Sequence, residues 1–211
     1  MTDPPAAPVR RILLATSNPG KAREFLALLP RGIEVVTLAD LGLPSPPEDG
    51  VTLDDNAVTK ALAGAVSGYL TVADDSGLEV DALGGAPGVH SARYAGTTVS
   101  DAANREKLLA QMRTIEPGQR TARFRCVVAI AGPSGLIATA GGHLDGVIAP
   151  VARGDGGFGY DPVFELPDGR TLAEIPLFEK NAISHRGRAY RAALPALRAC
   201  LDASRPEGTG R

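Results

Sequence analysis

The sequence predicts a mixed α/β fold, and three observations support this class. First, short strand-like runs alternate with helical segments in the N-terminal half: residues 11–16 are strand-like, residues 17–20 form a turn, and residues 21–29 show helical spacing of apolar side chains. Second, from Thr121 the pattern changes to β-branched runs separated by glycine-rich turns, which is typical of an antiparallel meander. Third, helical spacing returns near the C-terminus. Helices combined with both kinds of strand fit neither an all-α nor an all-β domain.

A second helix is predicted after the first strand and helix. Thr52 is a suitable N-cap for a helix that continues to about Val66, and Asp55 stands three residues later, at the capping-box position. The proline-rich residues 44–50 precede this helix, so we expect them to be irregular.

A short buried strand is predicted over residues 70–73. We expect it to end at the turn-forming residues 74–77, after which residues 78–81 are extended and residues 83–96 form a glycine-rich loop. Ser100 is a suitable N-cap for a further helix that ends at about Met112.

The C-terminal half is predicted to contain the meander and a last helix. Two glycine-containing segments, residues 132–135 and 141–142, are expected to separate strands of the meander. Residues 152–161 are too rich in glycine for a regular element. Ser184 is a suitable N-cap for the last helix, which carries an apolar face of Leu194, Leu197 and Leu201.

The length of 211 residues suffices for one domain, which we expect over residues 10–202 between disordered ends at residues 1–9 and 203–211. There are 22 Lys and Arg against 24 Asp and Glu, so the chain lacks the basic surface of a nucleic-acid-binding protein. No apolar run approaches the roughly 20 residues that span a bilayer, and the N-terminus has no signal-type segment. We therefore expect a cytoplasmic protein that binds neither nucleic acid nor membrane. Its two cysteines, Cys126 and Cys200, are expected to be reduced thiols.

A candidate phosphate site lies at the junction of the first strand and the first helix. Free backbone N–H groups, the positive end of the helix and a lysine could all face a phosphate there. The spacing of glycines is not that of a P-loop, and no hydroxyl follows the lysine to hold a metal ion. The same segment also fits an ordinary strand-to-helix turn. The candidate residues are Thr16, Ser17, Asn18, Pro19, Gly20 and Lys21.

Carboxylates for a metal ion are available at Asp74 and Asp75. Successive strand residues point to opposite faces, so only one of the two is expected to face a ligand. Mg²⁺ usually takes one or two protein carboxylates together with water and substrate phosphates. Glu48 and Asp49 are further candidates. Solvated turn and loop charges are the alternative for all four acids.

A glycine-rich loop brings two aromatic rings and an acid together at Phe158, Gly159, Tyr160 and Asp161. Rings of this kind stack on nucleobases, and the glycines allow close approach of the backbone. The alternative is a turn with one ring packed in the core. Near the start of the last helix, positive charge and hydrogen-bond donors gather at Lys180, His185 and Arg186, which a solvated helix start would explain equally well.

Taken in order, these segments resemble the inosine triphosphate pyrophosphatase family, including its bacterial dITP/XTP pyrophosphatases. Each motif alone is weak, whereas the ordered set between about Arg11 and Leu201 is specific. The matching segments are residues 17–21, 55–57, 73–78, 84–88, 91–94, 157–162 and 183–186.

The resemblance implies an elongated, two-lobed α/β protein, usually a homodimer, with a nucleotide in the cleft between the lobes. It implies Mg²⁺-dependent hydrolysis of noncanonical purine triphosphates such as ITP, dITP and XTP to the monophosphate and pyrophosphate, which keeps deaminated purines out of DNA and RNA. The resemblance implies that Asp75 is the general base and a metal ligand, that Glu48 is a second metal ligand, and that Ser76 contacts the substrate. It implies phosphate contacts for residues 17–21 and Lys180. It further implies a base-binding loop at residues 158–161 and reading of the purine 6-keto group by His185 and Arg186.

Two other functions remain open at this point. One is a related pyrophosphatase that acts on other modified nucleotides, and the loop at Phe158 together with His185 and Arg186 disfavours it. The other is a nucleotide-binding regulator without turnover, which the presence of Asp75 and Lys21 disfavours.

Overall fold

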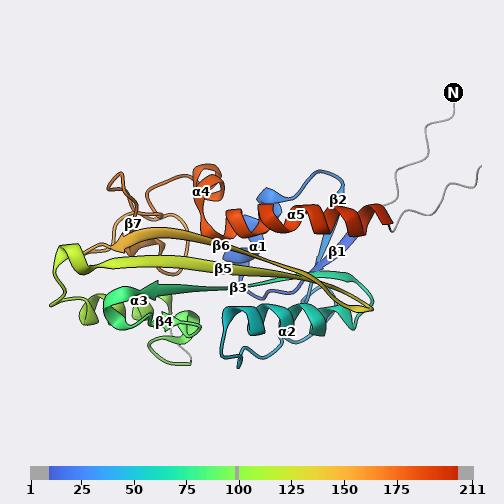
Figure 1. Ribbon diagram of the computed structural model, residues 1–211, viewed down its shortest axis with the longest axis horizontal. Helices are drawn as coiled ribbons and strands as arrows, with labels where there is room; N and C mark the ends of the chain where they lie inside the picture. The colour runs from blue at the N-terminus through green and yellow to red at the C-terminus, as the bar shows by residue number, and fades with distance from the viewer. Residues whose placement is uncertain (1–9, 98–99, 204–211) are drawn as a thin grey trace, which may run out of the picture.

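The computed structural model describes residues 10–97 and 100–203 and shows an elongated protein built on one long, twisted sheet (Figure 1). The predicted disordered ends, residues 1–9 and 204–211, lie outside the described residues. Ala203, predicted to belong to the tail, is the last residue of the C-terminal helix. No helix in the described part of the chain is both long and apolar enough to cross a membrane.

The sheet combines parallel and antiparallel strands, as the predicted mixed fold requires. Its strand order is β2, β1, β3, β5, β6 and β7, with β4 paired to β3. The neighbours of β1 run parallel to it, and the remaining pairs are antiparallel. The strands are β1 (Arg10–Leu14), β2 (Ile33–Thr37), β3 (Leu70–Val80), β4 (Pro87–Gly88), β5 (Thr121–Gly132), β6 (Gly135–Ile148) and β7 (Phe164–Glu165).

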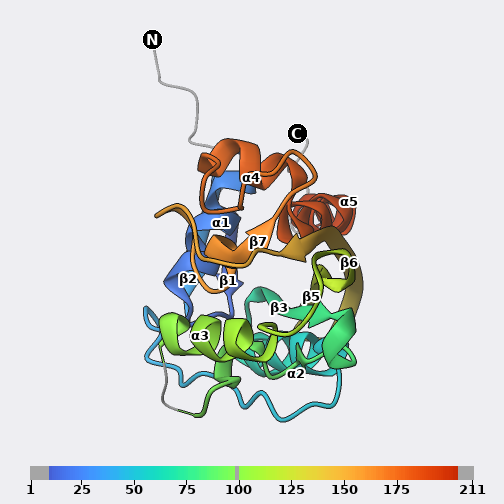
Figure 2. The same cartoon turned by 90° about the vertical axis from the view of Figure 1, so that its left-hand side faces the viewer.

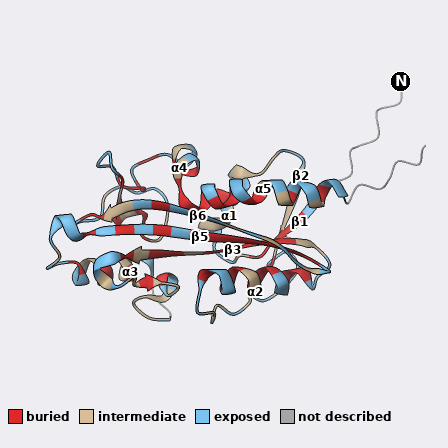
Figure 3. Cartoon of the chain, in the orientation of Figure 1, coloured by how far each residue is buried: buried red, intermediate tan, exposed pale blue. Residues whose placement is uncertain are grey.

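Helices cover both faces of the sheet at the end that holds β1 and β2. Alternate strand residues face the two helical layers: Val72 packs with one hydrophobic cluster and Ala73 with the other. The first cluster is closed by α1 (Pro19–Leu28) and α5 (His185–Ala203), and the second by α2 (Leu53–Ala65). The buried residues therefore form bands along the central strands (Figure 3).

A third hydrophobic cluster occupies the other end of the molecule, where α3 (Asp101–Gln111) crosses near the ends of β3, β5 and β6 (Figure 2). Leu78, Leu108, Phe124 and Phe164 are among its buried members. The long strands thus join two hydrophobic bodies. One consists of the first two clusters, on either face of the sheet at the β1 end, and the other is the third cluster at the α3 end. These two bodies correspond to the two expected lobes. The remaining elements are α4 (Leu177–Ile183) and the short 3-10 helices Asp81–Leu83, Ser91–Arg93, Pro117–Gln119 and Asp161–Val163.

The predicted helix caps are confirmed by their hydrogen bonds. Thr52 Oγ1 accepts from Asp55 N at 3.0 Å, and the Asp55 carboxylate accepts from Thr52 N at 3.0 Å, which completes the capping box of α2. Ser100 Oγ accepts from Ala103 N at 3.2 Å, and Ser184 Oγ accepts from Gly187 N at 3.0 Å. Local side-chain chemistry therefore determines where these helices begin.

The prediction that a strand ends at Asp74 is wrong. β3 continues to Val80 and pairs residue by residue with β5, with Asp74 opposite Val128 and Asp75 opposite Val127. Cations from other elements neutralise these two acids, so their charges do not interrupt the strand.

The prediction that residues 141–142 separate two strands is also wrong, because both glycines lie inside β6. A Cβ atom at Gly142 would stand 2.3 Å from the carbonyl oxygen of His185 and 2.5 Å from the nitrogen of Ala189, so glycine there allows α5 to approach the sheet. The sequence analysis also missed β2 and α4.

Candidate active site

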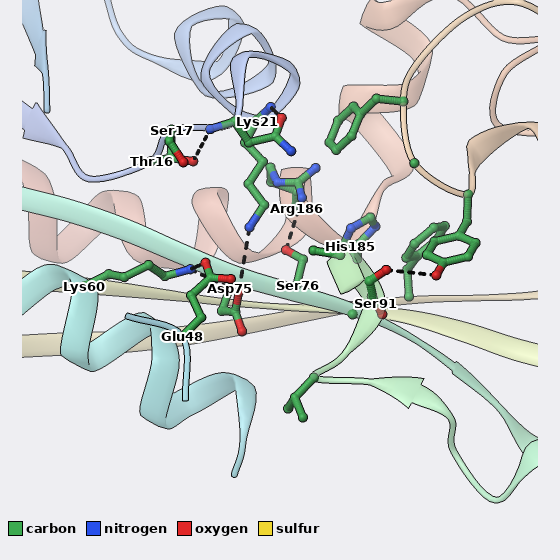
Figure 4. A pocket seen from close by; sticks show the side chains of 18 of the residues that line it. Thr16, Ser17, Lys21, Glu48, Lys60, Asp75, Ser76, Ser91, His185 and Arg186 are labelled. Atoms are coloured by element: carbon green, nitrogen blue, oxygen red, sulfur yellow. Dashed lines mark hydrogen bonds and ion pairs between the residues drawn. The ribbon is translucent and has the colours of Figure 1, made fainter. Parts of the chain in front are cut away.

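A cavity of about 520 Å³ lies between the two hydrophobic bodies and collects most of the predicted site residues. Figure 4 shows Glu48, Lys60 and Asp75 at one end and His185 at the other. Pro19 and Gly20 do not line it, and neither do the further metal-ligand candidates Asp49 and Asp74. The predicted residues that do are Thr16, Ser17, Asn18, Lys21, Glu48, Asp75, Ser76, Phe158, Gly159, Tyr160, Asp161, Lys180, His185 and Arg186.

The turn before α1 presents side chains rather than a set of free backbone N–H groups, which corrects the prediction. Asn18 Oδ1 accepts from Gly20 N at 2.9 Å and Lys21 N at 3.1 Å, and Thr16 Oγ1 accepts from Asn18 N at 3.2 Å. Gly20 allows the loop that carries Phe158 to pack closely, because a Cβ there would lie 2.6 Å from the Phe158 ring.

Asp75 faces the cavity, whereas its neighbour Asp74 points to the opposite side of β3, as alternation along a strand predicts. Asp75 Oδ2 accepts from Asn56 Nδ2 at 3.0 Å, and its Oδ1 accepts from Lys60 Nζ at 3.0 Å. Lys21 Nζ lies 3.8 Å from the same Oδ1. The carboxylate is therefore held in one orientation from two helices.

Glu48 meets Asp75 at the same ammonium group. Lys60 Nζ donates to Glu48 Oε1 at 2.6 Å, and the Lys60 side chain is 6% exposed. Partial burial opposes ionisation of Glu48, but the attraction of Lys60 outweighs it and lowers the pKa of Glu48 below its ordinary value. The carboxylates of Glu48 and Asp75 therefore converge on Lys60 at one point of the cavity wall.

Asp74 forms the buried floor beneath the cavity. Its Oδ2 lies 3.2 Å from Arg186 Nε and 3.3 Å from Lys21 Nζ, and it accepts from Ser76 Oγ at 3.1 Å. Complete burial raises the proton affinity of this carboxyl, but Lys21 and Arg186 outweigh burial, so the pKa of Asp74 lies well below its ordinary value.

The other end of the cavity is built around Phe158. Its ring centroid lies 4.9 Å from Lys180 Nζ and 5.3 Å from Arg186 Cζ. Lys180 forms ion pairs with Asp161 and, at 2.6 Å, with Glu24, and Arg186 donates to the other oxygen of Glu24. Burial dominates at Asp161 and raises its pKa despite the adjacent Lys180.

Only one of the two rings of the predicted loop is free to stack on a base. Tyr160 belongs to the buried cluster at the α3 end, and its hydroxyl donates to the carbonyl of Ser91 at 2.8 Å. Burial raises its pKa. Phe158 is partly exposed and lines the cavity.

His185 is a buried, neutral ring at the same end. It stacks on Phe124 with ring centroids 4.6 Å apart and an interplanar angle of 10°. Burial, together with the charges of Arg186 and Lys180, lowers its pKa well below 6.5. Its Nδ1 is buried and has no hydrogen-bond partner within the described chain.

Three buried polar residues that hold the site were not predicted from the sequence: Glu24, Asn56 and Lys60. A signal for them exists, because they stand on the apolar faces of α1 and α2, beside Phe25 and Ala57. A polar residue at the buried position of an amphipathic helix needs a partner, and here the partners are the cavity acids and cations.

One chain of ion pairs runs through the whole cavity. It contains five carboxylates and four cations, so its net charge is −1 with His185 neutral. In order, its members are Glu48, Lys60, Asp75, Lys21, Asp74, Arg186, Glu24, Lys180 and Asp161.

Comparisons with known proteins agree with this architecture. A dITP/XTP pyrophosphatase of Desulforamulus reducens is 51% identical over 191 residues, which are 89% of this chain and 95% of that protein. A HAM1 protein of Coxiella burnetii has a similar structure, with a TM-score of 0.79 and 38% identity over 92% of this chain and all of that one. A nucleoside-triphosphatase / dITP/XTP pyrophosphatase of Mycobacterium abscessus has a TM-score of 0.69 and 46% identity, over 88% of this chain and 99% of that one. Residues 12–196 match the Ham1 family, and the chain therefore belongs to that family.

Proposed function

We propose that this enzyme hydrolyses noncanonical purine nucleoside triphosphates, namely ITP, dITP and XTP, to the nucleoside monophosphate and pyrophosphate. The observation that carries the proposal is the division of one cavity into two ends. One end presents Lys21, Lys60 and two carboxylates, and the other presents the Phe158 ring beside Arg186. A triphosphate and a purine fit these two ends, and the pyrophosphatase names of the relatives agree with the assignment.

The charge of the cavity supports a divalent cation. Every lysine of the ion-pair chain is already matched by carboxylates, so a triphosphate with about four negative charges would enter a site that is itself negative. Glu48 and Asp75 offer oxygen ligands that meet at Lys60, and this donor set suits Mg²⁺, which completes its shell with water and phosphate oxygens. Mg²⁺ bound there would neutralise phosphate charge and polarise the reacting phosphate.

Asp75 is the residue best placed to act as the general base. Its carboxylate faces the cavity, and Asn56 and Lys60 hold both of its oxygens. In the proposed reaction, Asp75 accepts a proton from the attacking water, whose oxygen forms a bond to the α-phosphorus while the bond from that phosphorus to the bridging oxygen breaks. Lys21 and Lys60 stabilise the charge that develops on the leaving pyrophosphate.

Arg186 and His185 are proposed to select 6-keto purines. Arginine has five N–H donors and no acceptor, and Arg186 donates hydrogen bonds to Asp74, Glu24 and Ser76. The remaining donors match a keto oxygen, whereas the amino group of adenine would leave them unpaired. His185 lines the same end of the cavity, which supports a second contact to the base. The family resemblance further supports a cytoplasmic homodimer as the working form.

A nucleotide panel tests the proposal. The purified chain is incubated with ITP, XTP, ATP, UTP or a methylated GTP, with Mg²⁺ or with EDTA, and pyrophosphate is measured. We expect pyrophosphate from ITP and XTP only when Mg²⁺ is present. Turnover restricted to UTP or methylated GTP would instead support the related pyrophosphatase, and tight binding of ITP without product would support the regulator.

A further inference from the structure

The loop that carries Phe158 has little intrinsic rigidity. Gly157 and Gly159 have φ angles of 70° and 61°, a region that favours glycine, and glycine leaves the backbone many alternative conformations. The position of the ring must therefore be determined by specific hydrogen bonds to the loop backbone. One of them comes from the inner side, where the Asp161 carboxylate accepts from Phe158 N at 2.8 Å.

The outer side of the loop is held by the first turns of α3. Asp101 Oδ2 accepts from Gly159 N at 2.7 Å, and Arg105 Nη1 donates to Gly159 O at 2.8 Å. Residues four apart on a helix share one face, so a single helical face binds both backbone polar groups of one glycine. Asp101 also lines the cavity.

α3 is a firm support for these two contacts. Asn104 is 2% exposed, donates to the carbonyl of Ala92 at 3.2 Å and accepts from Ala95 N at 2.8 Å. Leu108 of the same helix is fully buried in the cluster at that end of the molecule. The helix therefore cannot follow the loop if the loop moves.

We propose that Asp101 and Arg105 are positioning residues for base recognition, which act through Gly159 to hold the Phe158 ring where a purine stacks. The inference rests on the proposed function and extends it to a helix outside the segments that carry the family resemblance. A purely structural alternative exists: an acid in the first turn of a helix is stabilised by the helix dipole, and Arg105 would then be an ordinary surface cation. The two explanations differ in what they predict for the substrate.

The test compares Asp101→Ala and Arg105→Ala with Asp101→Asn, which keeps an acceptor for Gly159 N. Glu106→Ala is the matched control, because Glu106 is an exposed acid of the same helix that does not line the cavity. We expect Asp101→Ala and Arg105→Ala, each of which removes one hydrogen bond to Gly159, to raise KM for ITP about five- to tenfold. Each should leave kcat within about twofold of wild type. The inhibition constant of pyrophosphate should not change, because the phosphate end is untouched. Asp101→Asn should recover most of the lost affinity.

A second measurement does not depend on turnover. Amide hydrogen exchange of Gly159 in the nucleotide-free protein should become several-fold faster in Asp101→Ala and stay at the wild-type rate in Glu106→Ala. If wild type fails to hydrolyse ITP, the proposed function is wrong, and the exchange rates still decide whether α3 holds the loop. If wild type is active but KM for ITP is the same in Asp101→Ala and Glu106→Ala, or if the pyrophosphate constant rises in parallel with KM, the assignment is overturned.

Discussion

Asp74 and Asp75 differ in function because successive residues of β3 face opposite sides of the sheet. Asp74 is fully buried and binds cations beneath the cavity, whereas Asp75 faces the space that the substrate would occupy. Each acid is paired with cations in a largely buried place: Asp74 with Lys21 and Arg186, and Asp75 with Lys60. The division of roles follows from strand geometry and not from any difference between the two side chains.

Replacing Asp75 with asparagine should reduce kcat for ITP by about 10²- to 10⁴-fold, the usual contribution of a general base. The amide keeps the shape of the side chain but cannot accept the proton or contribute the same charge to a metal ion. Steady-state kinetics and a binding titration with IMP would separate loss of chemistry from loss of fold. Asp49→Asn is the control, because Asp49 is exposed and does not line the cavity. Turnover within about tenfold of wild type in Asp75→Asn would contradict the assignment.

Replacing Arg186 with alanine should lower kcat/KM for ITP far more than for ATP. A donor that is left unpaired in a buried site costs about 1 to 3 kcal/mol, so the ratio between the two substrates should shrink by about tenfold or more. Because Arg186 also neutralises Asp74 and Glu24, the melting temperature should be measured in parallel, and Arg186→Lys provides a variant that keeps the positive charge. An unchanged ITP-to-ATP ratio in both variants would remove base reading from Arg186.

Among the helices and strands, the features that depend on residues nearby in the sequence, such as helix starts, were predictable. Thr52, Ser100 and Ser184 mark helix starts by local hydrogen bonds, and all three are confirmed. The extension of β3 past Asp74 was not predictable in this way, because two adjacent acids interrupt an apolar strand pattern. The cations that pair with these two buried acids come from α1, α2 and α5, which are distant from them in the sequence.

The candidate site shows the same division. Almost all of the predicted residues line one cavity, because the family motifs mark the residues that face it. Glu24, Asn56 and Lys60 were missed because a polar residue in a helix is usually solvated, and only the packed structure reveals what they contact.

Alanine substitutions at Gly141 and Gly142 test how closely α5 packs on the sheet. Alanine at position 142 would place Cβ against the backbone of α5 at 2.3 Å, whereas at position 141 the nearest atom lies 3.9 Å away. Gly142→Ala should therefore lower the free energy of unfolding by about 1 to 3 kcal/mol, as overpacking does, and raise KM for ITP by displacing His185 and Arg186. Gly141→Ala should change neither by much. Equal unfolding midpoints in urea for the two variants would show that close approach of α5 is unimportant.

At the scale of the whole molecule, the buried His185 makes stability depend on pH. Its pKa in the folded protein lies well below 6.5, so between pH 7 and 5.5 the unfolded chain binds a proton that the folded protein does not. Stability is therefore fully present above about pH 6.5 and falls as the pH drops, by about 1 kcal/mol at pH 5.5 from this one group. Carboxyl groups with lowered pKa, such as Asp74 and Glu24, lose their contribution only at more acidic pH.

Urea denaturation at pH 7 and pH 5.5 measures this effect. The variant His185→Asn loses the ring stacking on Phe124 and should be less stable at both pH values, but its stability should fall by about 1 kcal/mol less than that of wild type between them. If wild type and variant show the same difference between the two pH values, His185 does not titrate as its burial requires.

The two hydrophobic bodies joined by β3, β5 and β6 leave a cavity between them, with the proposed triphosphate site at one end and the proposed purine site at the other. In the proposed reaction water attacks the α-phosphorus, and hydrolysis of ITP in ¹⁸O-labelled water identifies the phosphorus that is attacked. Mass spectrometry of the products should find one ¹⁸O atom in IMP and none in pyrophosphate. Label in pyrophosphate, or formation of IDP and orthophosphate, would contradict the account.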